Sequence, residues 1–190
     1  MSFTIVEQSV VTLRSYGELP IAFTVASQYR IAAIDGGKGG WRLTEERVER
    51  PFVKDYDAGS ERPLRWAQKW DLSHWVVLAA IGVGMRLGGA VVAWNTPGVN
   101  MLEERDDLAV LWDLRVHPEH RRKGIGAQLF RHAAAWARAK GCRQLKVETQ
   151  NINVPACKFY AKQGCYLGAV HYGAYPEYPD EAQLLWYLDL

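Results

Sequence analysis

A short basic turn containing two glycines is the most informative segment of this 190-residue chain. It reads Arg121-Arg-Lys-Gly-Ile-Gly-Ala127 and lies between an apolar stretch ending at Val116 and an amphipathic stretch. Glycines allow backbone angles at which several N–H groups point into one concavity, and a helix start adds partial positive charge. With its arginine and lysine side chains, such a turn can bind a pyrophosphate. A solvated basic turn before a helix is the alternative interpretation.

A second segment places an asparagine and a tyrosine two helical turns apart. In Glu148-Thr-Gln-Asn-Ile-Asn-Val-Pro-Ala-Cys-Lys-Phe-Tyr160, Asn153 can cap a helix through its side-chain oxygen. Tyr160 follows seven residues later and therefore projects to a similar face. A phenol with the ordinary pKa of about 10 is protonated at neutral pH and can donate a proton. The alternative for Tyr160 is a core position beside Phe159.

Hydrophobic periodicity predicts the elements that position these segments. In the second half it predicts helices over 125–140 and 153–163, and strands over 107–116, 143–149, 165–170 and 183–190. The first half is mostly strand, over 21–31, 41–48, 75–81 and 87–94, with a short helix over 62–70. The glycine-rich stretch 36–40 lacks the ending of a phosphate loop and indicates a flexible turn. This order predicts an α/β (α+β) fold, with a mixed sheet and helices packed on it.

Composition argues against several classes of protein. The 23 basic and 21 acidic residues nearly balance, and the basic stretch has no interleaved aromatics, so we expect no nucleic-acid partner. The chain start lacks a signal-peptide pattern and no stretch approaches about 18 apolar residues, so we expect a cytoplasmic protein without a membrane partner. Its length fits one domain over residues 1–190.

Cysteines and histidines point to neither disulfides nor a metal. Cys142, Cys157 and Cys165 are odd in number and lie inside predicted elements, so we expect buried thiols in a reducing compartment. The spacing of histidines and cysteines matches no familiar zinc arrangement. We therefore expect no metal cofactor.

With the basic glycine turn and the segment 148–164 placed between these predicted elements, the chain resembles the GNAT superfamily of acetyl-CoA-dependent N-acetyltransferases. The resemblance covers Asp107 to about Gly168. The family pattern Arg/Gln-x-x-Gly-x-Gly/Ala matches 121–126, and Asn-x-x-Ala-x-x-x-Tyr-x-x-x-Gly matches 153–164. It implies acetyl-CoA as co-substrate and a GNAT-like, mostly antiparallel central sheet flanked by helices.

The resemblance also implies roles for particular residues. The strand before the turn would offer backbone groups to the pantetheine arm and thioester, and the turn amides would wrap the pyrophosphate. The implied cofactor-binding residues are Leu114, Arg115, Val116, Arg121, Arg122, Lys123, Gly124, Ile125, Gly126, Ala127 and Asn153. In many relatives the tyrosine that matches Tyr160 protonates the departing CoA thiolate.

The sequence does not identify the general base. An ammonium with a pKa near 10.4 must lose a proton before it attacks, which costs about 4–5 kcal/mol at pH 7. Some superfamily members use a glutamate early in the strand that matches 109–116, where this chain has Val110. The remaining candidates are Asp113, Glu148 or water relayed to them, and each also has a structural alternative.

The acceptor is expected to be a small-molecule amine. Acidic residues cluster in 45–57, 103–107 and 177–181, and would attract a cation if these loops converge; solvated acidic loops are the alternative. Aromatic side chains that can supply apolar or cation–π walls are Trp112, Tyr172, Tyr175 and Tyr178. The segments 148–160 and 184–188 are similar to those of streptothricin acetyltransferases.

That similarity favours a streptothricin-like antibiotic or a polyamine as acceptor, and with it a role in antibiotic resistance. Two alternatives are a protein or peptide N-acetyltransferase and a CoA-binding sensor without turnover. The sequence does not determine the oligomeric state, and a homodimer is one of the possibilities.

Overall fold

The computed structural model describes residues 2–59, 62–82 and 84–190, which form two compact units. The first unit comprises 1–22, 55–147 and 188–190, and the second comprises 23–54 and 148–187. Strands β7 (Gln144–Gln150) and β9 (Gln183–Asp189) contribute residues to both.

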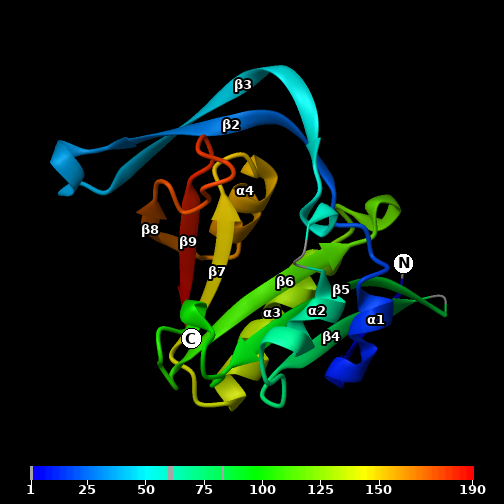
Figure 1. Cartoon of the computed structure of the whole chain (residues 1–190). Coiled ribbons are helices and arrows are strands. Elements are labelled where there is room, and N and C mark those ends of the chain that lie inside the picture. Colours follow the sequence, from blue (N-terminus) through cyan, green and yellow to red (C-terminus); the bar gives the residue numbers. More distant parts are fainter. Residues whose placement is uncertain (1, 60–61, 83) are drawn as a thin grey trace. The chain divides into compact units, whose positions relative to one another are not determined.

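The first unit is a sheet with helices on its faces (Figure 1). Its elements are β1 (Thr4–Gln8), α1 (Leu13–Tyr16), α2 (Pro63–Lys69), β4 (Val76–Gly82), β5 (Met85–Trp94), β6 (Leu108–Val116) and α3 (Ile125–Ala139). Its strands pair in the order β1-β4-β5-β6-β7. The pairs are antiparallel up to β6, whereas β6 and β7 run parallel.

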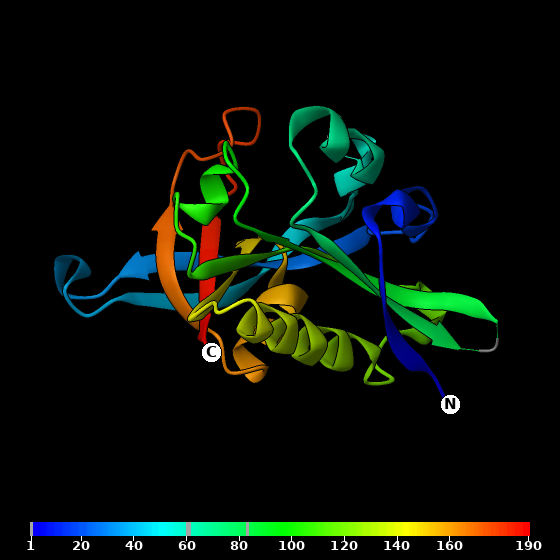
Figure 2. The ribbon, with the colours of Figure 1, turned by 90° about the horizontal axis from the view of Figure 1, so that it is seen from below.

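Two adjacent glycines of β5 let helices approach both faces of this sheet. A Cβ on Gly88 would lie 3.2 Å from the Ile125 side chain of α3, whereas one on Gly89 would lie 2.7 Å from the Tyr16 ring of α1. Successive strand residues face opposite sides. Helix α3 therefore packs on one face, where Figure 2 shows it running along the strands, and Tyr16 packs on the other.

The second unit combines a long ribbon with a helix and the remaining strands. Its elements are β2 (Phe23–Ala33), β3 (Trp41–Lys54), α4 (Val154–Lys162) and β8 (Tyr166–His171), with most of β9. β2 and β3 pair antiparallel, and Gly36, Gly37 and Gly40 in their connection have positive φ, as a tight turn requires. β9 lies between β7 and β8 in the hydrogen-bonding order and is antiparallel to β8.

The predicted fold class is confirmed: the sheet is mostly antiparallel and is flanked by helices. Each predicted strand and helix is present with ends shifted by a few residues, and β3 is longer than expected. Periodicity did not predict β1 and α1, which are short and depend on partners far along the chain. The expectation of one domain over 1–190 stays a prediction.

The described helices include none with the length and apolar character that a membrane span needs.

The three cysteines are free and buried, as expected, and should be unreactive in the folded protein. Burial raises the pKa of Cys142 and Cys157 to about 11 and that of Cys165 to about 12, so little of the reactive thiolate exists near pH 8. We expect Ellman's reagent to label the native chain slowly and all three thiols quickly in guanidinium chloride. Equal labelling rates in the two states would contradict this burial.

Candidate active site

The basic glycine turn has the backbone geometry of a ligand-binding turn. Arg122 and Gly124 have φ of +61° and +84°, both in the left-handed region. Gly124 is the N-cap of α3, and no described side chain caps this helix. The first N–H groups of α3 are therefore available for oxygen atoms of a ligand.

The basic side chains of this turn are exposed: two of them hold the turn through hydrogen bonds, and the third is available to a ligand. Arg121 Nε donates to the Val116 carbonyl at 3.1 Å, and Lys123 Nζ donates to the Glu119 carbonyl at 2.8 Å. These bonds hold the turn. Arg122 is exposed and makes no hydrogen bond or ion pair within the described ranges, so its charge is available to an anion.

Among the described residues of the first unit, the end of β6 has one backbone edge without strand partners. Val116, Arg115 and Leu114 pair with β5, but the pairing of β6 with β7 runs only from Leu108–Gln144 to Leu111–Val147. A free strand edge can bind an extended ligand through main-chain hydrogen bonds. This edge provides a physical basis for the roles expected of residues 114–116.

A β-bulge at Trp112 precedes this edge. Val91 of β5 pairs with Asp113 and Val92 pairs with Leu111, which leaves Trp112 as the extra residue. The Trp112 ring lies 4.9 Å from Trp70 and 5.1 Å from Trp75, measured between ring centroids. Trp112 and Trp70 are both half-buried, so part of this tryptophan group remains accessible to a ligand.

Arg115 is the centre of a buried ion network in the first unit. Its guanidinium donates to both oxygens of Asp57 at 2.5 and 3.0 Å, to Asp113 Oδ2 at 2.8 and 2.6 Å, and to the Leu19 carbonyl at 3.2 Å. An arginine has five N–H donors, so these contacts use all of them. Burial disfavours the charge, but Asp113 and Asp57 outweigh it and raise the pKa of Arg115 above its ordinary value.

This network limits the chemistry that Arg115 and Asp113 can perform. With its side chain only 1% exposed and saturated, Arg115 adds no uncompensated charge beside the basic turn, and its main chain is what it can offer a cofactor. Asp113 is 6% exposed at its side chain, and its Oδ2 accepts two hydrogen bonds from Arg115, which argues against Asp113 as a base.

In the second unit, the segment after β7 folds as the sequence predicts. Asn153 caps α4, because its Oδ1 accepts a hydrogen bond from the Ala156 N–H at 3.2 Å. Tyr160 is 7% exposed on α4, and its ring meets Phe159 edge-on with centroids 5.1 Å apart. The predicted position of Tyr160 in this helix is confirmed, and its role as a proton donor stays a prediction.

Glu148 is held in a polar network of the second unit. Its Oε1 accepts the Tyr175 hydroxyl at 2.5 Å and the Gln150 amide at 3.3 Å, and its Oε2 accepts the Gln183 amide at 2.7 Å. A carboxylate has about four acceptor positions. One position on Oε2 is therefore open to a further donor, so Glu148 can bind a cation in a fixed orientation.

Several carboxylates of the predicted acidic clusters are already paired. Glu45 binds Lys158 and Glu181 binds Lys54, both at 2.6 Å, and the Lys54 ammonium also lies 3.5 Å from the Tyr178 ring centroid. In the first unit, Glu103 binds the buried Lys146 at 2.6 Å. The acidic loops are thus less free to attract a cation than their composition suggests.

The structure therefore assembles the candidates in two groups. The basic turn, the β6 edge, Trp112 and Asp113 belong to the first unit, and Asn153, Tyr160 and Glu148 belong to the second. The sequence placed Asp57 only in the acidic cluster 45–57 and gave no indication of its pairing with Arg115, and it did not indicate Gln183 or Trp70 as contributors. The contacts of Asp57 with Arg115 and of Trp70 with Trp112 carried no local signal, since each pair is more than 40 residues apart.

Comparison with known proteins identifies one family. The model described as "Acetyltransferase (GNAT) family" matches residues 41–165. Streptothricin acetyltransferase A of Bacillus subtilis (strain 168) is 28% identical over 151 residues, which is 78% of this chain and 80% of that protein. Streptothricin acetyltransferase of Streptomyces lavendulae is 31% identical over 144 residues, 75% of this chain and 70% of that protein.

Solved structures share the fold. A Bacillus anthracis protein provisionally assigned as a streptothricin acetyltransferase, solved with acetyl coenzyme A, aligns over 100% of both chains at 23% identity with a TM-score of 0.78. Nourseothricin acetyltransferase aligns over 100% of this chain and 99% of its own, also at 23% identity, with a TM-score of 0.75.

Proposed function

Because this chain belongs to the GNAT acetyltransferase family and is an acetyl-CoA-dependent N-acetyltransferase, we propose that its acceptor is a primary amine of a small cationic molecule of the streptothricin type. The family, enzyme class and co-substrate expected from the two sequence motifs are confirmed. The observation that carries the acceptor proposal is the similarity to two streptothricin acetyltransferases over about three quarters of the chain. Such an activity would protect a cell from the antibiotic.

Acetyl-CoA binding is assigned to the basic turn, the β6 edge and Asn153. The pyrophosphate would accept hydrogen bonds from the uncapped N–H groups at the start of α3, in residues 124–127. Arg122 would add a charge-assisted contact, while Arg121 and Lys123 hold the turn in shape. The backbone of Leu114–Val116 would bind the pantetheine arm, as a strand edge binds an extended peptide.

Gly124→Ala should weaken acetyl-CoA binding, because a side chain in the left-handed region costs about 1–2 kcal/mol and would shift the turn. Gly141→Ala is a matched control, since Gly141 follows the other end of α3 with φ of +83° and also has open space around its Cβ. Both variants should lose similar stability in thermal unfolding. Only Gly124→Ala should raise the dissociation constant of acetyl-CoA in calorimetry; equal binding by both variants would remove the turn from the site.

Acetyl transfer would proceed by direct attack of the acceptor nitrogen on the thioester carbonyl. The tetrahedral intermediate collapses with cleavage of the C–S bond, and the CoA sulfur takes a proton while the nitrogen loses one. We assign the proton for the sulfur to the Tyr160 hydroxyl. Asp113 is committed to Arg115, so the open position on Glu148 Oε2 is the better candidate to bind the acceptor ammonium and receive its proton.

Glu148→Gln should lower kcat/KM for a cationic acceptor by about 10- to 100-fold, because hydrogen bonds to charged groups contribute about 1.5–3 kcal/mol. Glu45→Gln is the control: it removes one carboxylate of the same unit, but one that is exposed and paired with Lys158. Initial rates should be measured from pH 6 to 9. A profile for Glu148→Gln that overlays the wild-type profile would exclude Glu148 as anchor and base.

The acceptor is tested by acetyl-CoA-dependent release of free thiol with streptothricin-type antibiotics, polyamines, aminoglycosides and lysine peptides, with a no-acceptor control. The slow reaction expected of the protein thiols keeps their background low. Preferred turnover of the streptothricin-type antibiotics supports the proposal. Preferred turnover of peptides would instead favour a protein acceptor, and acetyl-CoA binding without turnover on any acceptor would favour a sensor.

A further inference from the structure

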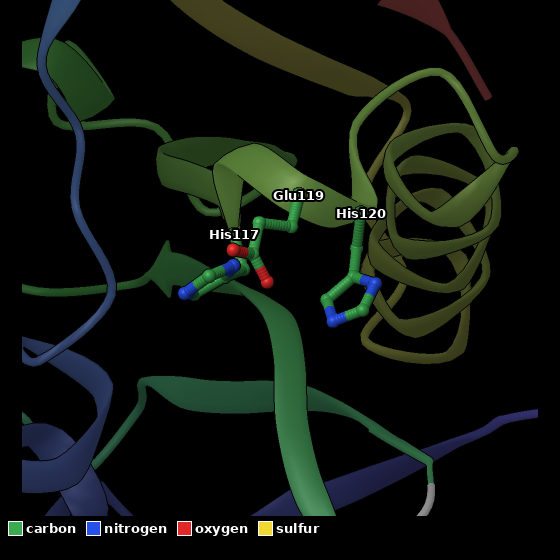
Figure 3. Close-up of side chains that lie close together, drawn as sticks. All are labelled: His117, Glu119 and His120. Carbon is green, nitrogen blue, oxygen red and sulfur yellow. The ribbon is translucent and has the colours of Figure 1, made fainter.

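Three potential metal ligands meet in one turn of the first unit, between β6 and the basic turn. His117, Glu119 and His120 each offer one ligand atom, and these atoms lie within 4.8 Å of one another. Figure 3 shows the Glu119 carboxylate between the two imidazole rings, whose centroids are 5.5 Å apart. The spacing i, i+2, i+3 within a single 3-10 turn is what gathers them.

None of these three side chains is used by the rest of the described structure. The Nδ1 atoms of His117 and His120 are buried without a hydrogen-bond partner, and the Glu119 carboxylate makes no ion pair in the described ranges. By contrast, His74 Nδ1 and His132 Nδ1 lie 2.7 and 2.9 Å from backbone carbonyls. Leaving a buried polar group unsatisfied costs about 1–3 kcal/mol, so two in one turn require an explanation.

We propose that His117, Glu119 and His120 form a binding site for a divalent transition-metal ion such as zinc. Two imidazole nitrogens and one carboxylate oxygen suit zinc, cobalt or nickel, whereas magnesium and calcium prefer oxygen ligands alone. Zinc binds such ligands at about 2.0–2.2 Å, so the donors must approach one another more closely. Glu119 is exposed and its side chain can rotate to allow this.

The bound ion would stiffen the turn that leads into the cofactor-binding segment. His120 is followed directly by Arg121, and the His120 N–H donates to the His117 carbonyl at 2.8 Å. Lys123 is joined to the same turn through the Glu119 carbonyl. The ion takes no part in acetyl transfer itself, and its role is to hold this turn.

The familiar zinc patterns of histidines and cysteines do not predict this site. Its donors include no cysteine, and the carboxylate stands between the two histidines. The site depends on the 3-10 turn Pro118–His120, which follows the end of β6.

The site is tested with untagged, chelator-treated enzyme and the metals alone. Zinc should bind one equivalent in calorimetry and raise the midpoint of thermal unfolding. Cobalt should give visible d–d absorption bands that zinc abolishes. Loss of a supporting hydrogen bond to a ligand costs about 10- to 100-fold in metal affinity, so loss of a ligand in His120→Ala or Glu119→Gln should cost at least as much.

His132→Ala, which removes an exposed histidine of α3, is the matched control and should bind zinc like the wild type. Thermal unfolding of the metal-free variants checks that each one folds, and His117→Ala gives a second ligand variant if His120→Ala does not. Absence of saturable zinc binding in the wild type overturns the proposal. Equal affinity of His120→Ala, Glu119→Gln and the wild type overturns it as well.

Discussion

Tyr160→Phe is expected to lower kcat for acetyl transfer by about 10²- to 10⁴-fold, the usual contribution of a general acid, while acetyl-CoA binding changes little. The substitution removes one oxygen and keeps the ring, so the edge-on contact with Phe159 at 5.1 Å is retained. The loss should therefore appear in turnover, because the CoA thiolate then leaves without its proton donor. Initial-rate kinetics and acetyl-CoA titration together check this.

Tyr166→Phe serves as the matched control for this prediction. Tyr166 lies on β8 in the same unit, is 46% exposed and stacks on Tyr187 at 6.0 Å. It should keep wild-type kcat, and its pH profile should keep the wild-type limb at high pH, which Tyr160→Phe should lose or shift. An unchanged kcat of Tyr160→Phe would contradict the proton-donor role and would indicate that Tyr160 only packs in the core.

Arg115→Met should lower the free energy of unfolding by about 3–5 kcal/mol, the range for breaking a buried ion pair by removing one partner. Methionine fills much of the space but cannot satisfy the carboxylates of Asp113 and Asp57, whose side chains are 6% and 21% exposed. The Leu19 carbonyl also loses its donor. Urea unfolding followed by tryptophan fluorescence measures the change, since Trp66 and Trp75 are buried in the same unit.

The same substitution in an exposed ion pair gives the control. Arg30 pairs with Glu46 on the β2–β3 ribbon, with side chains 61% and 44% exposed, and Arg30→Met should cost less than about 1 kcal/mol. Asp113→Asn in the Arg115→Met background should recover part of the stability, because it removes one uncompensated charge. Similar losses for Arg115→Met and Arg30→Met would show that the network adds nothing beyond a surface pair.

What the sequence determined by itself is local. The helices α3 and α4, the β4–β5 hairpin and the Asn153 cap depend on residues within one or two turns of each other, so periodicity and capping rules predicted them. The same holds for the basic turn, where Gly124 supplies a left-handed backbone at the start of a helix. These local motifs also carried the resemblance that located the cofactor segment.

Only the tertiary structure decided how the charged side chains are used. Arg115 is a basic residue six positions before the turn, but its guanidinium is saturated by Asp57, 58 residues away, and by Asp113. Glu148 acquired its orientation from Tyr175 and Gln183, on a distant loop and strand. Strand pairing and burial select such partners, and desolvation makes the pairing obligatory, so no spacing along the chain encodes which carboxylate remains open for chemistry.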